Sequence, residues 1–69
     1  MASELERIRK LAGVSRAKAA VRAGVSEPLA RLFEAAGPDE IKDLRKRAAL
    51  VRVYGELSSG ASGGGHEAA

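Results

Sequence analysis

Cysteine is absent from this chain of 69 residues, and histidine occurs only once, as His66. Without cysteine the chain cannot form a disulfide, and a zinc site built from cysteine and histidine is excluded for the same reason. A domain of this size buries only about 60% of the surface of its unfolded chain, so its stability has to come from well-packed helices or from self-association. We therefore expect no metal and no other cofactor.

Catalytic groups are equally scarce. His66 lies in a stretch of glycine, serine and alanine, where nothing would hold its ring against a serine and an acid. No glycine-rich loop follows a predicted strand, so the phosphate-cradling motif of nucleotide enzymes is missing. Asp39, Glu40 and Asp43 lie close together, but the start of a helix explains this acidic group without a metal. We expect the protein not to be an enzyme and to have no small-molecule substrate.

Aromatic residues and long apolar runs are missing as well. Phe33 and Tyr54 are the only aromatic residues, which argues against single-stranded nucleic acid, because its binders stack bases on aromatic side chains. No apolar run approaches the ~20 residues that a membrane span needs. The first six residues are acidic and lack the apolar core of a signal peptide. Together with the lack of cysteine, these absences predict a cytoplasmic protein that does not contact membranes.

Glycine and serine residues mark the ends and the starts of the predicted helices. Gly13, Gly24 and Gly37 each follow an alanine, and glycine just past the last periodic residue is a usual helix stop. The motif Ala-Gly-Val-Ser occurs twice, at residues 12–15 and 23–26, as a helix stop, a buried valine and a helix N-cap. The predicted helices cover residues 4–12, 16–23, 27–36 and 38 to 54 or 57. We predict an all-α bundle of four short helices over residues 3–57, followed by a disordered Gly/Ser-rich tail over residues 58–69.

Apolar spacing predicts which helix faces are buried. In the second helix the expected buried side is Ala17, Ala20 and Val21. In the fourth helix the residues that repeat at helical spacing are Ile41, Leu44, Ala48 and Val51, and the apolar stripe is widened by Leu50, Val53, Tyr54 and Leu57. Residues 50–54 are also β-branched enough to form a strand, which would have to pair with another chain. The helix is the favoured alternative.

Residues 16–33 have the composition of a tight helix-turn-helix unit. Ala20 would lie where the two helices meet, Gly24 would make the turn, and Val25 would fill the core between the helices. Ser26 would cap the second helix. The positions expected to face back inside are Ala30 and Phe33.

This pattern resembles the helix-turn-helix of bacterial and phage DNA-binding proteins. Residues 19–26 are also similar to the start of the small terminase subunits of tailed phages, which engage packaging DNA. These resemblances imply a DNA-binding protein. Two positions suit that role poorly, because Glu27 and Glu34 in the second helix of the unit would face a polyanion. Only Arg31 in that helix suits the reading of base edges.

The distribution of charge supports the same partner. The chain carries 12 Lys and Arg residues against 9 Asp and Glu residues, and the segment from Arg7 to Val25 contains six basic residues and no acidic one. One-sided basic runs are typical of phosphate-binding surfaces. An alternative is that they are only the solvated faces of two helices. The residues expected to contact nucleic acid are Arg16, Lys18, Arg22, Ser26, Arg31, Arg45, Lys46 and Arg47.

Two functional hypotheses follow. The first is a small regulatory protein of a phage, plasmid or other mobile element that binds double-stranded DNA as a dimer, because one short unit reads few base pairs. The second is a helical protein-interaction module, such as an adaptor, an inhibitor or a self-assembling dimer. It rests on more apolar residues than so small a core can hide. The expected interface residues are Leu29, Leu32, Leu50, Val53, Tyr54 and Leu57.

Overall fold

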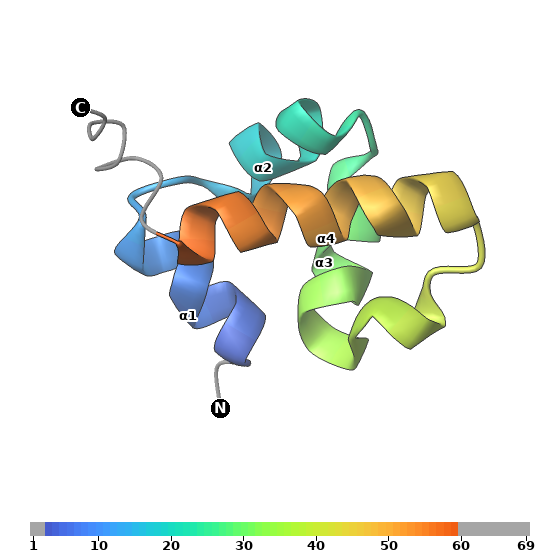
Figure 1. The fold of residues 1–69 in the computed structure, drawn as a ribbon, viewed down its shortest axis with the longest axis horizontal. Helices are drawn as coiled ribbons and strands as arrows, with labels where there is room; N and C mark the ends of the chain where they lie inside the picture. Colours follow the sequence, from blue (N-terminus) through green and yellow to red (C-terminus); the bar gives the residue numbers. More distant parts are fainter. Residues whose placement is uncertain (1–2, 60–69) are drawn as a thin grey trace.

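The computed structural model describes residues 3–59, and the predictions for residues 60–69, including His66, lie outside this range. Four helices follow one another: α1 (Glu4–Leu11), α2 (Arg16–Ala23), α3 (Glu27–Ala36) and α4 (Leu44–Ser58). A 3-10 turn, η1 (Pro38–Glu40), lies between α3 and α4 (Figure 1). Residues 3–59 contain no strand, so the all-α prediction is confirmed and residues 50–54 are helical. α4 ends at Ser58, one residue past the predicted end of the helical domain.

The first three helices begin where the sequence predicts, and α2 and α3 also end there, whereas α1 ends at Leu11, one residue before the predicted end. Their N-cap hydroxyl oxygens accept a hydrogen bond from the backbone N–H three residues on, at 3.0 Å for Ser3, 3.1 Å for Ser15 and 3.3 Å for Ser26. Positive φ values occur at the three predicted helix stops, Gly13, Gly24 and Gly37. A left-handed residue closes a helix end at little cost only when it lacks a Cβ atom, so glycine suits these positions.

The two Ala-Gly-Val-Ser motifs form the same turn. After α2, the N–H of Val25 donates to the carbonyl of Ala20 and the N–H of Gly24 donates to the carbonyl of Val21. After α1, the N–H of Val14 donates to the carbonyl of Arg9 and the N–H of Gly13 donates to the carbonyl of Lys10. This pair of bonds is the Schellman arrangement, which satisfies the last carbonyls of a helix. The repeat therefore encodes two equivalent helix-to-helix connections.

The start of α4 differs from the prediction. Pro38 opens the short turn η1 and not the helix itself, which begins only at Leu44. Asp43 is the N-cap of α4, and its Oδ1 accepts hydrogen bonds from the backbone N–H groups of Arg45 at 3.0 Å and Lys46 at 3.1 Å. Asp39 and Glu40 therefore lie in the turn η1, whereas Asp43 starts α4. Asp43 is a better N-cap than Gly37, because its side chain accepts hydrogen bonds from the first turn of the helix.

The predicted buried side of α2 is wrong at two of its three positions. Ala20 is buried, but Ala17 is exposed and Val21 is 79% exposed. The buried residues of α2 are Ala19, Ala20 and Ala23. Because these side chains are methyl groups, α2 packs closely against both α3 and α4.

The wide apolar stripe predicted for the fourth helix is buried on one side only. Leu44, Ala48 and Val51, expected in the core, are exposed, and only Ile41, which precedes the helix, is buried. Four residues expected at a partner interface form the core instead: Leu50, Val53, Tyr54 and Leu57. They repeat at i, i+3, i+4 and i+7 and therefore make one face of the helix. These four side chains are not available to a partner.

The other helices surround α4, which runs across the view in Figure 1 with α2 on one side and α1 and α3 on the other. α1 packs against α4 and α3, whereas the backbones of α3 and α4 approach each other less closely. Large side chains fill that space: the rings of Phe33 and Tyr54 meet edge to face, with centroids 5.0 Å apart. Among the helices of residues 3–59, none has the length and apolar character needed to cross a membrane.

Candidate functional site

The candidate site is built around a carboxylate that the fold buries. Glu34 lies on the inner face of α3 with Ala30 and Phe33, at i, i+3 and i+4 spacing, and is only 4% exposed. The expectation that Glu34 would face a polyanion is therefore wrong. A buried carboxylate requires compensation by charge and by hydrogen bonds.

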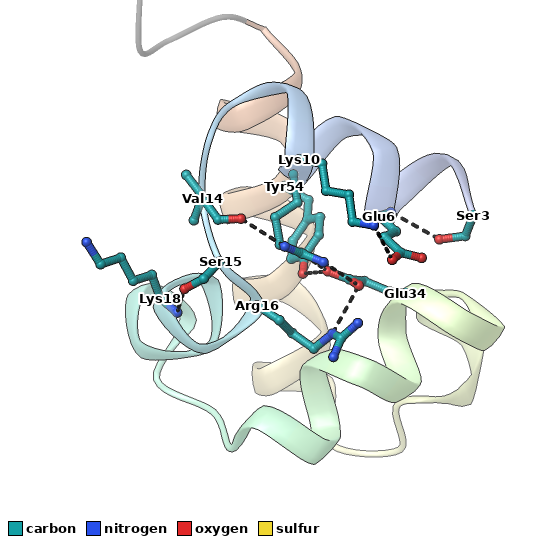
Figure 2. A network of polar contacts seen from close by, with 10 residues as sticks. Ser3, Glu6, Lys10, Val14, Ser15, Arg16, Lys18, Glu34 and Tyr54 are labelled. Carbon is teal, nitrogen blue, oxygen red and sulfur yellow. Dashed lines mark hydrogen bonds and ion pairs between the residues drawn. The ribbon is translucent and has the colours of Figure 1, made fainter. Parts of the chain in front are cut away.

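Both oxygens of Glu34 are fully used. Oε2 accepts hydrogen bonds from Arg9 Nε at 2.5 Å and from the hydroxyl of Tyr54. Oε1 accepts from Arg16 Nε at 3.2 Å and from Arg9 Nη2 at 3.4 Å. Figure 2 shows the bonds of Arg16 and Tyr54 reaching Glu34 from different sides. Four donors match the roughly four acceptor positions of an ionised carboxylate.

Arg9 also contacts the loop that connects α1 to α2. Its side chain is buried, and Nη1 donates to the carbonyl of Val14 at 2.9 Å. Arg9, Arg16, Glu34 and Tyr54 come from α1, α2, α3 and α4 respectively, so one group of polar contacts connects all four helices. We call these four residues the Glu34 cluster.

The pKa values of the cluster keep its charges fixed. Burial alone would raise the pKa of Glu34, but hydrogen bonds from Arg9, Tyr54 and Arg16 together lower it below its ordinary value of 4.5. The hydrogen bond to Glu34 raises the pKa of Arg9. Burial, with the hydrogen bond to Glu34, raises the pKa of Tyr54, so its hydroxyl keeps its proton and remains a donor. Near neutral pH the cluster contains two guanidinium groups and one carboxylate.

This arrangement is suited to holding the fold, because its polar groups bind one another. Every acceptor position of Glu34 is occupied, so the carboxylate has no open position for a proton or a metal. Elsewhere in residues 3–59, His, Cys, Asp and Glu form no group of three that could hold a metal ion. The chemistry left to the site is the binding of anions by the guanidinium groups at its edge.

Much of the basic run in residues 7–25 is neutralised by acids outside it. Arg9 and Arg16 pair with Glu34, Arg7 pairs with Glu4 at 3.3 Å, and Lys10 pairs with Glu6 at 3.1 Å. Within residues 3–59 the basic residues that are exposed and form no ion pair are Lys18, Arg22, Arg31, Lys42, Arg45, Lys46 and Arg52. Charge counted along the sequence therefore overstates the charge that α1 offers to a polyanion.

The residues predicted to contact nucleic acid have different environments. Lys18, Arg22 and Arg31 are exposed on α2 and α3, and Arg45 and Lys46 are exposed at the start of α4. The Ser26 hydroxyl is used as the cap of α3. Two residues have structural roles: Arg16 in the Glu34 cluster, and Arg47, whose Nε donates to the Ile41 carbonyl at 3.2 Å.

The predicted interface residues of α3 remain at the surface only in part. Leu32 is 39% exposed, whereas Leu29 packs partly against the core. The exposed apolar side chains of α4 are Leu44 and Val51, which the sequence assigned to the core.

Sequence reasoning missed the buried pair of Arg9 and Glu34, although a signal was present. Arg9 lies at i+4 and i+1 from the partly buried Leu5 and Ile8, and Glu34 lies at i+4 from the buried Ala30. Opposite charges at core positions of two different helices indicate a buried ion pair.

Comparison of the chain with protein-family models, curated proteins and solved structures finds no match in any of the three.

Replacing Glu34 by Gln should destabilise the fold strongly. Glutamine keeps the shape but leaves the buried Arg9 without a counter-charge, which costs about 3–5 kcal/mol in the free energy of unfolding. Tyr54→Phe, which removes a single donor, should cost about 1.5–3 kcal/mol. Urea denaturation followed by circular dichroism measures both. Glu27→Gln, an exposed position on the same helix, is the control and should stay within about 0.5 kcal/mol of the wild type.

The stability should fall in acid because the folded protein holds the pKa of Glu34 below its ordinary value of 4.5. The contribution of the ionised cluster is complete above that ordinary value and is lost as pH falls through the lower folded pKa. We expect the unfolding free energy of the wild type to decrease from about pH 4.5 downward and that of Glu34→Gln to decrease less. Parallel pH profiles for the two proteins would contradict this role of the carboxylate.

Proposed function

We propose that the protein binds double-stranded DNA through the helix-turn-helix formed by α2 and α3. The observation that carries the proposal is the close packing of α2 on α3 through alanine side chains, with a left-handed Gly24 between the helices. This unit leaves Lys18, Arg22 and Arg31 exposed and outside the ion pairs of residues 3–59. A regulatory role in a phage or mobile element rests on the resemblance of residues 16–33 alone.

The charges of this surface suit phosphates better than bases. Lys18 and Arg22 lie on the exposed side of α2, and side chains of this kind hold a protein against the DNA backbone. On α3, Arg31 is the exposed residue able to form two hydrogen bonds with guanine, while Glu27 opposes the phosphates. Affinity should therefore come mainly from phosphate contacts, with little selectivity for sequence.

Fluorescence anisotropy with a random-sequence duplex tests the proposal. Binding should weaken tenfold or more between low and physiological salt, because phosphate contacts release counterions. Arg22→Gln should reduce the slope of log affinity against log salt by about 0.9, the contribution of one phosphate contact. Arg7→Gln is the matched control, since it removes the same charge from a residue already paired with Glu4. The proposal fails if no duplex binds at low salt, or if both variants change the slope equally.

A second function, self-association through α4, is favoured by the exposed face of that helix. Leu44 is 67% exposed and Val51 is 49% exposed, and Ala48 and Gly55 lie on the same face. Gly55 is a poor helix former, costing about 0.8–1.0 kcal/mol relative to alanine. A Cβ atom added to it would meet nothing within 4 Å, so packing inside one chain does not explain the glycine.

The spacing of this face fits a second copy of the chain in antiparallel orientation. The large and small residues alternate as Leu44, Ala48, Val51 and Gly55 at intervals of 4, 3 and 4 residues, which read the same in both directions. An antiparallel copy would place Leu44 against Gly55 of the partner subunit and Ala48 against Val51 of the partner subunit. Large side chains would then face small ones throughout, which is how closely approaching helices interdigitate.

Sedimentation velocity tests self-association, with salt as a second variable. Val51→Glu should weaken a dimer about tenfold or more, because it buries an unpaired charge. Val21→Glu is the control, since Val21 is exposed on a different helix, α2. Higher salt should strengthen the dimer, because the antiparallel register brings Arg45 near Arg52 of the partner subunit and the two would repel each other. A monomer at all concentrations would exclude this function.

A further inference from the structure

A feature not used above is a hollow of about 210 Å³ between α1 and α3. Ser3 and Glu6 of α1 line one side, and Arg31, Glu34 and Ala35 of α3 line the other. Arg16 reaches the hollow from α2. We call it the α1–α3 notch.

Arg16 is held in the notch in a fixed orientation. Its Nε donates to Glu34 Oε1 at 3.2 Å, and Glu34 is itself held by Arg9 and Tyr54. The two terminal nitrogens of Arg16 have no hydrogen-bond partner among residues 3–59, and Figure 2 shows them beyond the bond to Glu34. A guanidinium bound through Nε still presents two parallel N–H groups on its outer edge. That edge fits two oxygens of one anion without further ordering of the side chain.

The acidic residues of the notch are already compensated. Glu34 has all its acceptor positions filled by Arg9, Arg16 and Tyr54. Glu6 pairs with Lys10 at 3.1 Å. Arg31 is exposed and forms no ion pair within residues 3–59, so its charge adds to the terminal nitrogens of Arg16 at the edge of the notch.

We propose that the α1–α3 notch is a binding site for a phosphate group. The outer edge of Arg16 would hold two phosphate oxygens, and the guanidinium of Arg31 would reach the same group from α3. The hydroxyl of Ser3, whose oxygen accepts from the Glu6 N–H, still has its own proton to donate. Donors from three elements suit a tetrahedral oxyanion better than a planar carboxylate, which one guanidinium edge satisfies.

The phosphate has two chemical sources. One is the backbone of a DNA duplex, in which case the inference rests on the proposed function. The other is inorganic phosphate or a small phosphomonoester, in which case it does not. The site itself is the same in both, because the recognised group is the phosphate.

Titration with inorganic phosphate at constant ionic strength tests the notch directly, by NMR of the Arg Nε–Hε groups and the backbone amides. We expect saturable shifts at Arg16, Arg31 and Glu6, with chloride giving none. Arg31→Gln should weaken phosphate binding about tenfold, the effect of losing one charge-assisted hydrogen bond. Lys42→Gln removes one positive charge at an exposed position outside the notch and should leave phosphate binding unchanged.

The same variants with duplex DNA separate the two sources. If Arg31→Gln weakens both ligands and phosphate displaces the duplex, the source is the DNA backbone. If phosphate saturates the notch and no duplex binds, the notch stands as a site for free phosphate while the proposed DNA binding fails. If a duplex binds and phosphate gives no saturable shift, DNA binding stands and the notch is overturned.

Discussion

The carboxylate of Glu34 accepts hydrogen bonds from three other helices while it is almost excluded from water. Removing such a group from water is costly, and the attraction of Arg9 and Arg16 offsets the cost only when every acceptor position is filled. The positions of α1, α2 and α4 relative to α3 are therefore coupled, because a shift of any one breaks a bond to a buried charge. A core of apolar side chains alone would tolerate such shifts more easily. The cluster thus specifies one arrangement of a small bundle whose α2 contributes only alanine methyl groups.

The same cluster determines which charges are available to a partner. The cluster buries the charge of Arg9 and orients the guanidinium of Arg16, while Lys18, Arg22 and Arg31 stay at the surface. Of the cations on α2 and α3, Arg16 is therefore the one held by a buried carboxylate, and it borders the α1–α3 notch. The exposed face of α4 is a separate surface, and its arginines flank apolar residues and not the cluster.

The sequence predicted the helices well and their faces poorly, for physical reasons. Serine caps and glycine stops act within a few residues, so the starts and ends of α1, α2 and α3 could be read locally. α4 is apolar on two sides, and helical periodicity cannot decide whether Val51 or Leu50 faces inward. In α2 Ala17 and Ala19 have the same small side chain, so the residue type gives almost no signal about which of them faces inward. The pairing of Arg9 with Glu34 spans 25 residues, and only the assembled fold brings the two together.

The dependence of Arg9, Glu34 and Tyr54 on one another also constrains how the chain can evolve. Loss of one member leaves a buried polar group with a missing partner, so single substitutions at these positions should be rare among descendants. An apolar trio of similar volume could replace all three, since such exchanges are neutral or stabilising in other proteins. Arg16 could then no longer be oriented by a carboxylate. Related sequences should therefore keep or exchange the three residues as a set, and a lineage that exchanges them would have to find another way to hold Arg16.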